Sequence, residues 1–342
     1  MPTIKDVADA CGVSAATVSY VLNNRGAISP HTRERILAAA KELGYHPNAT
    51  ARGLARRRMN TLGVLFAGPH FAVLLSHYMA AILQGILDGA AEAGYNVTLF
   101  THPWEGTANS AAQLDDGRTD GILGVASDID SDLIGATTAM RRPLVLISSP
   151  YGDLPATFVY GDDRMGARQA TEYLLDLGHT RVAHLMGPEN RSSVPPRRDA
   201  FLETMAGRGL SVPPEYLAYG DYGGGLAYQQ TLRLLALPQP PTAIFAGNDY
   251  IAAGVLRAAN ERGVAVPERL SVVGYDDTLV TTLTTPSLTS VHQPLREIGR
   301  VAARLLVARL EGERDGKEDV TPRPHLLDTH LAVRGSTAPP AP

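Results

Sequence analysis

The sequence predicts a small all-α domain followed by two α/β subdomains with parallel sheets. Residues 1–45 carry the caps and apolar spacing of three short helices. From Thr61 onward, short apolar runs alternate with helical stretches, which is typical of parallel sheets covered on both faces. The chain has 342 residues, of which 44% are apolar and 19% charged, so it is long enough to bury more than one core.

The first two helices are predicted from their capping residues. Thr3 and Asp6 have the spacing of a capping box, with Asp in place of the usual Glu, and Gly12 ends the first helix. Ser14 can cap a second helix over residues 15–22. Because the turn between them is short and contains glycine, the pair has the pattern of a helix-turn-helix.

The third helix opens at Ser29-Pro30, with serine as cap and proline at the first helical position, and Gly44 closes it. We expect the apolar positions of the three helices to form one small core. These positions are Ile4, Val7, Ala8 and Cys11, then Val18, Val21 and Leu22, then Ile36, Leu37, Ala40 and Leu43.

The exposed face of the second helix is suited to reading DNA bases. It carries small or hydrogen-bonding side chains, namely Ala15, Ala16, Thr17, Ser19 and Tyr20. Residues 1–60 hold nine basic and four acidic residues, whereas the remainder of the chain has a net charge of −9. A basic N-terminal segment on an otherwise acidic chain indicates that this segment binds a polyanion. The alternative is an ordinary polar surface.

The head resembles the headpiece of the LacI/GalR repressors in several ordered motifs. They are Thr3-Ile4-Lys5-Asp6-Val7-Ala8, Gly12-Val13-Ser14, Thr17-Val18-Ser19, Val21-Leu22-Asn23 and Leu43-Gly44-Tyr45-His46-Pro47-Asn48. The resemblance implies that the second helix lies in the major groove, where Ala15, Ala16 and Tyr20 read bases. Many members have Arg where this chain has Tyr20, and tyrosine cannot make the bidentate guanine contact of arginine. The other head residues implied to contact DNA are Thr3, Ser14, Thr17, Ser19 and Asn23.

Residues 47–60 form a basic linker that is too short to be a stable helix in water by itself. The resemblance implies a hinge helix that orders on DNA and inserts Leu54 into the central base step through the minor groove. Thr50, Arg52 and Arg56 are then expected near phosphates. The alternative is a flexible tether.

The body is expected to contain two α/β subdomains, because about 280 residues exceed one comfortable core. Helices are predicted over 80–93 and 164–177. Strands are predicted at residues 63–67, 96–100, 121–125, 144–147, 181–186, 243–246 and 270–273.

Polar side chains follow several of the predicted strands, at the edge where open parallel sheets bind ligands. They include Asn248-Asp249, Asp276-Asp277, Asp221-Tyr222 and, after a polar loop over 190–193, Arg197. Carboxylates, an amide, a guanidinium and an aromatic ring suit a ligand with many hydroxyl groups. The alternative is that these Asp and Asn residues only cap helices, and for Asp249 and Asp277 the two interpretations are equally good.

The body also resembles the LacI/GalR regulatory core, which has a periplasmic-binding-protein-like fold. The motifs are Leu177-Gly178-His179, Gly247-Asn248-Asp249, Val273-Gly274-Tyr275-Asp276-Asp277 and Leu288-Thr289-Ser290-Val291-His292-Gln293-Pro294. The resemblance implies effector contacts from Tyr78, Arg197, Tyr222, Asn248 and Asp276. The loop over 69–75 is longer and more apolar than is usual in the family.

The resulting division is a headpiece over 1–46, a hinge over 47–60, a core over 61–336 and a loose tail over 337–342. The family's chain crosses between subdomains three times, which we expect near Gly161, His292 and Arg323. The first subdomain is then 61–160 plus 293–322, and the second is 161–292 plus 323–336.

The function predicted is that of a transcriptional regulator, specifically a repressor, that binds a near-palindromic operator as a homodimer. A small-molecule effector, a sugar in preference to a purine, is expected in the cleft between the subdomains. The alternatives are a solute-binding protein, which a basic head and the missing signal peptide oppose, and an enzyme. The sequence has no P-loop, Rossmann fingerprint or nucleophile elbow.

No cofactor or metal is expected. The single cysteine, Cys11, leaves no disulfide or cysteine zinc site within the chain, and the histidines lack zinc-helix spacing. We interpret His179 and His184 as surface and packing residues. No apolar run is long enough to cross a bilayer, so the expected compartment is the bacterial cytoplasm, at the nucleoid.

Overall fold

The computed structural model describes residues 2–22, 26–45, 58–66, 76–100, 112–125, 133, 135–136, 142–150, 156–314 and 323–342. The chain folds into two compact units, Met1–Met59 and Asn60–Pro342. We call them the head and the core and describe each by itself.

The head contains three helices, α1 (Ile4–Ala10), α2 (Ala15–Leu22) and α3 (Pro30–Glu42). The predicted caps are confirmed. Thr3 and Asp6 form a capping box, the Thr17 amide donates to the Ser14 hydroxyl at 3.1 Å, and the Thr32 amide donates to Ser29 at 3.2 Å. The buried residues of its core are Val7, Ala8, Cys11, Val18, Val21, Ile36 and Ala40.

Two apolar residues of the head lie on the surface instead of in this core. Leu37 and Leu43 are exposed, so the expectation that they face inward is wrong. The seven buried residues already fill the space between three short helices, and α3 turns only one narrow face toward it. Leu43 is the C-cap of α3, where the helical periodicity ends.

The first sheet of the core has the strand order β11-β5-β4-β3-β1-β2, with every pair parallel. Its strands are β1 (Thr61–Phe66), β2 (Asn96–Leu99), β3 (Gly121–Val125), β4 (Leu144–Ile147), β5 (Thr157–Gly161) and β11 (Pro324–Leu327). Helices α6 (His77–Glu92) and α14 (Leu295–Arg314) share one hydrophobic cluster with this sheet.

Helices α6 and α14 pack closely against each other at two glycines, Gly85 in α6 and Gly299 in α14. A Cβ at Gly85 would collide with the backbone carbonyl of Arg296 in α14, and one at Gly299 would collide with the carbonyl of Ile82. The two backbones therefore touch, which leaves α6 little freedom to shift. The helix begins at His77 and not at Ala80 as expected, because Ser76 caps it by accepting from the Met79 amide. Tyr78 consequently lies in its first turn.

The second sheet has the order β12-β10-β9-β8-β6-β7, parallel except for the antiparallel pair of β10 and β12. Its strands are β6 (Val182–Met186), β7 (Leu217–Tyr219), β8 (Ala243–Ala246), β9 (Ser271–Asp276), β10 (Thr289–His292) and β12 (His330–Ala332). A short 3₁₀ helix, η1 (Pro214–Tyr216), precedes β7.

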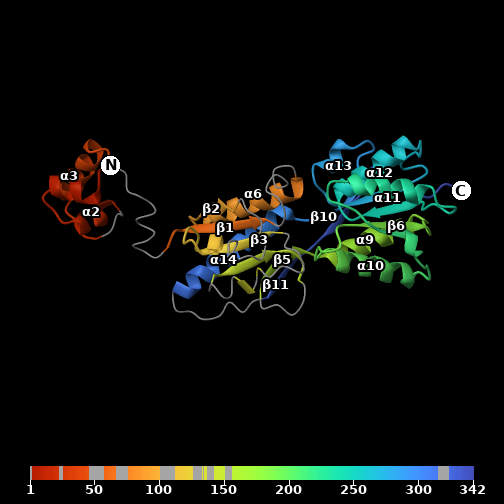
Figure 1. The fold of residues 1–342 in the computed structure, drawn as a ribbon, viewed down its shortest axis with the longest axis horizontal. Coiled ribbons are helices and arrows are strands. Elements are labelled where there is room, and N and C mark those ends of the chain that lie inside the picture. Colours follow the sequence, from red (N-terminus) through yellow and green to blue (C-terminus); the bar gives the residue numbers. More distant parts are fainter. Residues whose placement is uncertain are drawn as a thin grey trace. The chain divides into compact units, whose positions relative to one another are not determined.

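Helices cover both faces of this sheet (Figure 1). Helices α11 (Gly225–Leu235) and α12 (Asp249–Glu261) bury their apolar residues on one face, and α9 (Asp163–Asp176) and α10 (Val194–Gly207) on the other. The short α13 (Val280–Leu283) follows β9. Arg197 lies in α10 and does not belong to an extended polar loop, because the helix begins directly after Ser193.

The chain passes between the sheets three times. It leaves the first sheet after Gly161 and returns after His292. The expectation of a third passage near Arg323 is wrong. Strand β11 still pairs with β5 in the first sheet, so the passage comes after Leu327 and before β12. The apolar alternation of β11 is too short to show from sequence which sheet it joins.

The C-terminal residues are anchored, contrary to the expectation of a loose tail. The Val272 amide donates to the Ser336 carbonyl at 2.8 Å, and the Ala338 amide donates to the Ser271 hydroxyl at 3.0 Å. His179 lies 2.9 Å from the Ala338 carbonyl through Nε2 and is buried, so it is not a surface residue. His184 is a packing residue, stacked on Phe245 at 4.5 Å between ring centroids.

Candidate functional site

Helix α2 presents a small exposed surface. Ala16 and Tyr20 are exposed one turn apart, with Tyr20 retaining 53% of its accessible surface. Thr17 and Ser19 are half-buried, and so is Ala15, which packs against the head core. Since residues four apart share a helix face, Ala16 and Tyr20 form the outward edge of the predicted reading surface, with Ala15 turned partly away from it.

Two predicted DNA contacts are already engaged in capping. The Thr3 hydroxyl donates to Asp6 at 2.9 Å, and the Ser14 hydroxyl lies 2.9 Å from that of Thr17. The Thr3 amide and hydroxyl also lower the pKa of Asp6. The predicted contacts Asn23, Thr50, Arg52, Leu54 and Arg56 lie outside the described residues.

Arg197 is the centre of a buried charge cluster in the core. It lies in the first turn of α10 and is 7% exposed. Its Nε donates to Asp163 at 2.6 Å, and its Nη1 donates to the Gly247 carbonyl at 2.6 Å. Its guanidinium carbon lies 3.6 Å from the centroid of the Tyr275 ring. We call Arg197, Asp163, Tyr275 and Asp276 the Arg197 cluster.

The charges of this cluster hold Arg197 protonated. Burial alone lowers the pKa of Arg197, but Asp163 and, to a smaller extent, Tyr275 and Asp276 outweigh it, and the pKa is raised on balance. A guanidinium that is stacked on a ring and bonded on two sides is fixed in direction, which is what a ligand-orienting group requires.

Asp276 ends β9 and is 5% exposed. Its Oδ1 accepts from the Gln293 side chain at 2.7 Å. Burial, reinforced by the charge of Asp249 and opposed by Arg197, raises its pKa to about 8. Its φ of +98° is one that residues other than glycine rarely adopt, and such backbone strain concentrates at binding sites.

The neighbouring polar residues serve mainly as caps and braces. Asn248 caps α12 by accepting from the Ile251 amide at 2.8 Å. Asp249 is fully buried and accepts from Thr278 and Ser290, and burial raises its pKa to about 6. Asp277 is paired with Arg334 at 2.6 Å. Asp249 and Asp277 thus brace neighbouring segments, and the residue that caps α12 is Asn248 and not Asp249.

The charges of the Arg197 cluster shift the pKa of both predicted tyrosines. Tyr78 comes from the first subdomain, and its pKa is raised chiefly by burial and then by the negative charge of Asp276. Burial also raises the pKa of Tyr222, which Arg197 partly opposes. Tyr222 packs over Gly187, where a Cβ would lie 2.8 Å from the ring. The charged groups of Arg197 and Asp276 therefore act on both Tyr78 and Tyr222. Asn248 lies next to Gly247, whose carbonyl accepts from Arg197, and caps α12.

Three residues of this region, Ser148, Ser149 and Asp163, were not among the predicted site residues. Ser149 follows β4 and donates to Asp163, which lies at the start of α9 in the second subdomain. Ser148 beside it is buried, and its hydroxyl has no hydrogen-bond partner in the described part of the chain. The rule that residues directly after buried strands are informative could have found Ser148 and Ser149, but nothing in the sequence shows that Asp163 meets Arg197.

The two subdomains contact each other through polar pairs. Besides Ser149 and Asp163, the His77 Nδ1 of α6 lies 2.7 Å from the Tyr250 hydroxyl of α12. The first of these pairs includes Asp163, which is a member of the Arg197 cluster. A ligand bound at the cluster would therefore lie near a hydrogen bond that joins the two subdomains.

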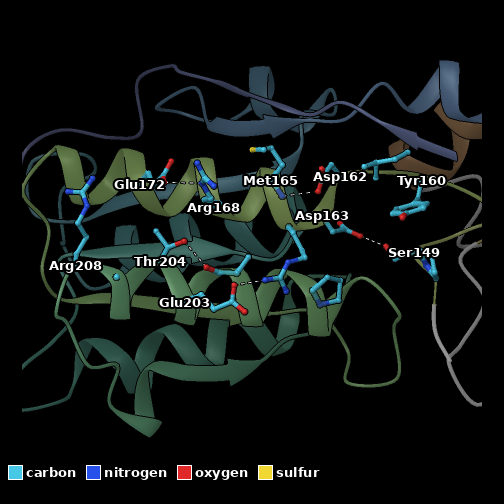
Figure 2. Close-up of a pocket in the computed structure, with 16 residues that line it drawn as sticks. Ser149, Tyr160, Asp162, Asp163, Met165, Arg168, Glu172, Glu203, Thr204 and Arg208 are labelled. Carbon is cyan, nitrogen blue, oxygen red and sulfur yellow. Dashed lines mark hydrogen bonds and ion pairs between the residues drawn. The ribbon is translucent and has the colours of Figure 1, made fainter. Parts of the chain in front are cut away.

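A separate pocket of about 850 Å³ lies between α9 and α10 (Figure 2). Its lining includes Ser149 and Asp163 but none of the five predicted effector residues. Arg164 and Glu203 pair across it, and their side chains are 53% and 63% exposed. Because its Arg164–Glu203 pair is exposed to solvent, whereas Arg197, Asp163 and Asp276 are buried, we do not regard this pocket as the main site.

Within the described ranges, no group of three or more His, Cys, Asp or Glu side chains has the arrangement of a metal site. No helix in the same ranges combines the length and apolarity needed to span a membrane.

Two family models match the chain. The model of bacterial regulatory proteins of the lacI family matches residues 3–48, and that of the periplasmic binding protein-like domain matches residues 171–337. The first covers the head helices, and the second begins within α9, covers the second sheet and also takes in α14 and β11.

Curated and solved relatives match nearly the whole length. The HTH-type transcriptional repressor PurR of Escherichia coli is 31% identical over 98% of each chain. A crystal structure of the lac repressor dimer bound to operator and the anti-inducer ONPF has a TM-score of 0.85 at 29% identity, over 98% of this chain and 99% of that one. The complex of the transcriptional regulator CelR with cellobiose has a TM-score of 0.75 at 31% identity, over 98% and 100%.

Proposed function

The chain belongs to the LacI/GalR family of bacterial transcriptional regulators, and from this premise we propose that it represses transcription from a near-palindromic operator that it binds as a homodimer. A small-molecule effector bound between the two subdomains of the core changes its affinity for the operator. The proposed division is the headpiece, a hinge over 47–60, and a core that carries the effector site.

The observation that carries the DNA-binding part is the outward edge of α2. A capped helix in a separate unit exposes a methyl group at Ala16 and a phenol at Tyr20, with Thr17 and Ser19 half-buried beside them. Neither group repels a base edge, and tyrosine can donate one hydrogen bond or contact a thymine methyl. The basic residues around this helix supply the phosphate contacts, which make binding dependent on salt.

Dimer formation has support in the surface of the second subdomain. Leu226 at the start of α11, Leu279 beside α13 and Leu283 at its end are exposed, with 70% of the surface of Leu283 accessible. A contiguous exposed apolar surface is typical of sites that meet a partner, and Leu279 and Leu283 lie four residues apart, one helical turn, at α13. A second copy also supplies the second α2 that a palindromic operator requires.

The effector proposed is a sugar. Asp276, Arg197 and Asn248 offer a carboxyl group, a guanidinium and an amide to hydroxyl groups, and the Tyr222 ring can stack on an apolar sugar face. The relative CelR is described in complex with cellobiose. A purine is the second candidate, because the same ring can stack on a base.

We also propose that the protein acts in the bacterial cytoplasm, at nucleoid DNA, and that it has no catalytic activity. The support is the description of its relatives as repressors. A regulator of this kind has to reach chromosomal DNA, and binding and release of an effector require no chemical step.

The proposal is tested by selecting bound duplexes from a random pool with the full-length chain and with a version lacking residues 1–58. We expect the full chain to enrich a two-fold symmetric site and the truncated chain to enrich none. A full chain that enriches no symmetric site would overturn the proposed function.

A further inference from the structure

Asp163 is a buried carboxylate that is not among the five predicted effector contacts. It is the first residue of α9 and is 4% exposed. One of its oxygens accepts from Arg197 Nε at 2.6 Å, and the other accepts from the Ser149 hydroxyl of the first subdomain. Both of its oxygens are therefore in use inside the protein.

The pairing determines how much positive charge Arg197 can offer to a ligand. A guanidinium has five N–H donors, and the bonds to Asp163 and Gly247 use two of them. The remaining donors can still reach a hydroxyl group. The charge itself, however, is already matched by a carboxylate in direct contact, in a place where water does not screen either group.

Asp163 is the charged group bonded directly to Arg197, and the other carboxyl groups nearby form their hydrogen bonds elsewhere. Asp249 adds a carboxylate that accepts from Thr278 and Ser290, and Asp276 adds a carboxyl group that accepts from Gln293. The nearby guanidinium of Arg191 lies over the Tyr222 ring at 6.0 Å from its centroid. A phosphate group placed against Arg197 would thus meet Asp163 at the same time, whereas a neutral hydroxyl group would not be repelled.

We propose that Asp163 sets the charge class of the effector, so that the site accepts neutral polyhydroxylated compounds and rejects phosphate esters. This inference rests on the proposed effector site at Arg197. It goes further in assigning a specificity-determining residue and in excluding sugar phosphates and nucleotides as effectors. Replacing the carboxylate by its uncharged amide leaves the shape of the site nearly unchanged and removes the charge that rejects anions.

The test uses inorganic phosphate as the probe, on the full-length chain at constant ionic strength. Asp163→Asn should bind phosphate at least tenfold more tightly than the wild type, in calorimetry and in the thermal shift. Asp162→Asn is the matched control. Asp162 is the neighbouring carboxylate and caps α9 through the Met165 amide at 2.9 Å, and asparagine caps equally well.

Equal phosphate binding by Asp163→Asn and Asp162→Asn would overturn the proposal. The wild type alone also tests it, in case Asp163→Asn does not fold. Wild-type protein that binds phosphate, and loses this binding in Arg197→Ala, would show that the site accepts anions. Operator binding is measured separately on the same proteins. Its absence would contradict the proposed function but would not bear on whether Asp163 makes the site reject anions.

Discussion

The two proposed binding surfaces of the molecule are built in opposite ways. On α2, the outward residues Ala16 and Tyr20 are exposed. In the Arg197 cluster, the polar groups are buried and already bonded to Asp163, Gly247 and Gln293. A surface that reads DNA can leave its side chains in water until the duplex arrives, whereas a small ligand needs groups whose direction is fixed beforehand.

This difference determines what a substitution does. On α2 a side chain can be changed with little consequence for folding, and the effect should appear in sequence preference. In the cluster, removing one charge leaves another buried without its partner, so stability and ligand binding change together.

The largest effect is expected for Arg197→Ala. It leaves Asp163 buried without its cation, which should lower the free energy of unfolding of the core by about 3–5 kcal/mol. Effector binding should be lost as well, and both are measured by urea denaturation and calorimetry. Arg198→Ala is the control, because its pair with Asp199 is exposed and should be worth less than about 1 kcal/mol. Equal losses in the two variants would show that the pairing of Arg197 and Asp163 adds nothing.

A change at the reading surface should leave stability intact. Tyr20→Ala should alter the preferred operator bases, with about 1–3 kcal/mol of discrimination lost at the contacted position. Selection from a random duplex pool measures this. Leu37→Ala is the control, since Leu37 is comparably exposed but lies on α3. If Tyr20→Ala selects the same site as the wild type, Tyr20 does not read bases.

The smallest effect concerns pH. Burial raises the pKa of Asp276 to about 8, so the folded protein keeps a proton that the unfolded chain loses near pH 4. The stability that this proton provides is complete below about pH 4 and is lost as the pH rises through about 8. Between about pH 7 and pH 9 the free energy of unfolding should fall by about 1.4 kcal/mol more in the wild type than in Asp276→Asn. Thermal unfolding across this range measures it, and identical profiles of the two proteins would refute the assignment to Asp276.

The head and the Arg197 cluster also differ in how much of each could be predicted from the sequence. The head helices follow from local signals such as Thr3-Asp6, Ser14 and Ser29-Pro30, each of which acts within one turn of its own helix. Half of the second sheet was predictable for a similar reason, since β6, β8 and β9 are continuous buried runs, whereas the short strands β7, β10 and β12 were not predicted. Leu37 and Leu43 show the limit, because burial depends on how much room the other helices leave.

The charge cluster was predictable only in part. Arg197 and Asp276 were identified because they follow strands or match family positions. Their partners Asp163 and Gln293 are 34 and 17 residues away in the chain, and no local pattern connects such distant residues. The anchored tail is a similar case, since Ser336 and Ala338 bond to residues of β9 more than 60 positions away.

The central claim is that occupancy of the core changes the affinity of the head for DNA. The most direct measurement is an operator titration of the full-length chain with and without a saturating effector, chosen as the compound that raises the melting temperature most. We expect the Kd for operator to change at least about fivefold in the wild type and to stay constant in Asp276→Ala, which should still bind operator. A wild-type Kd that is the same at every effector concentration would contradict the account.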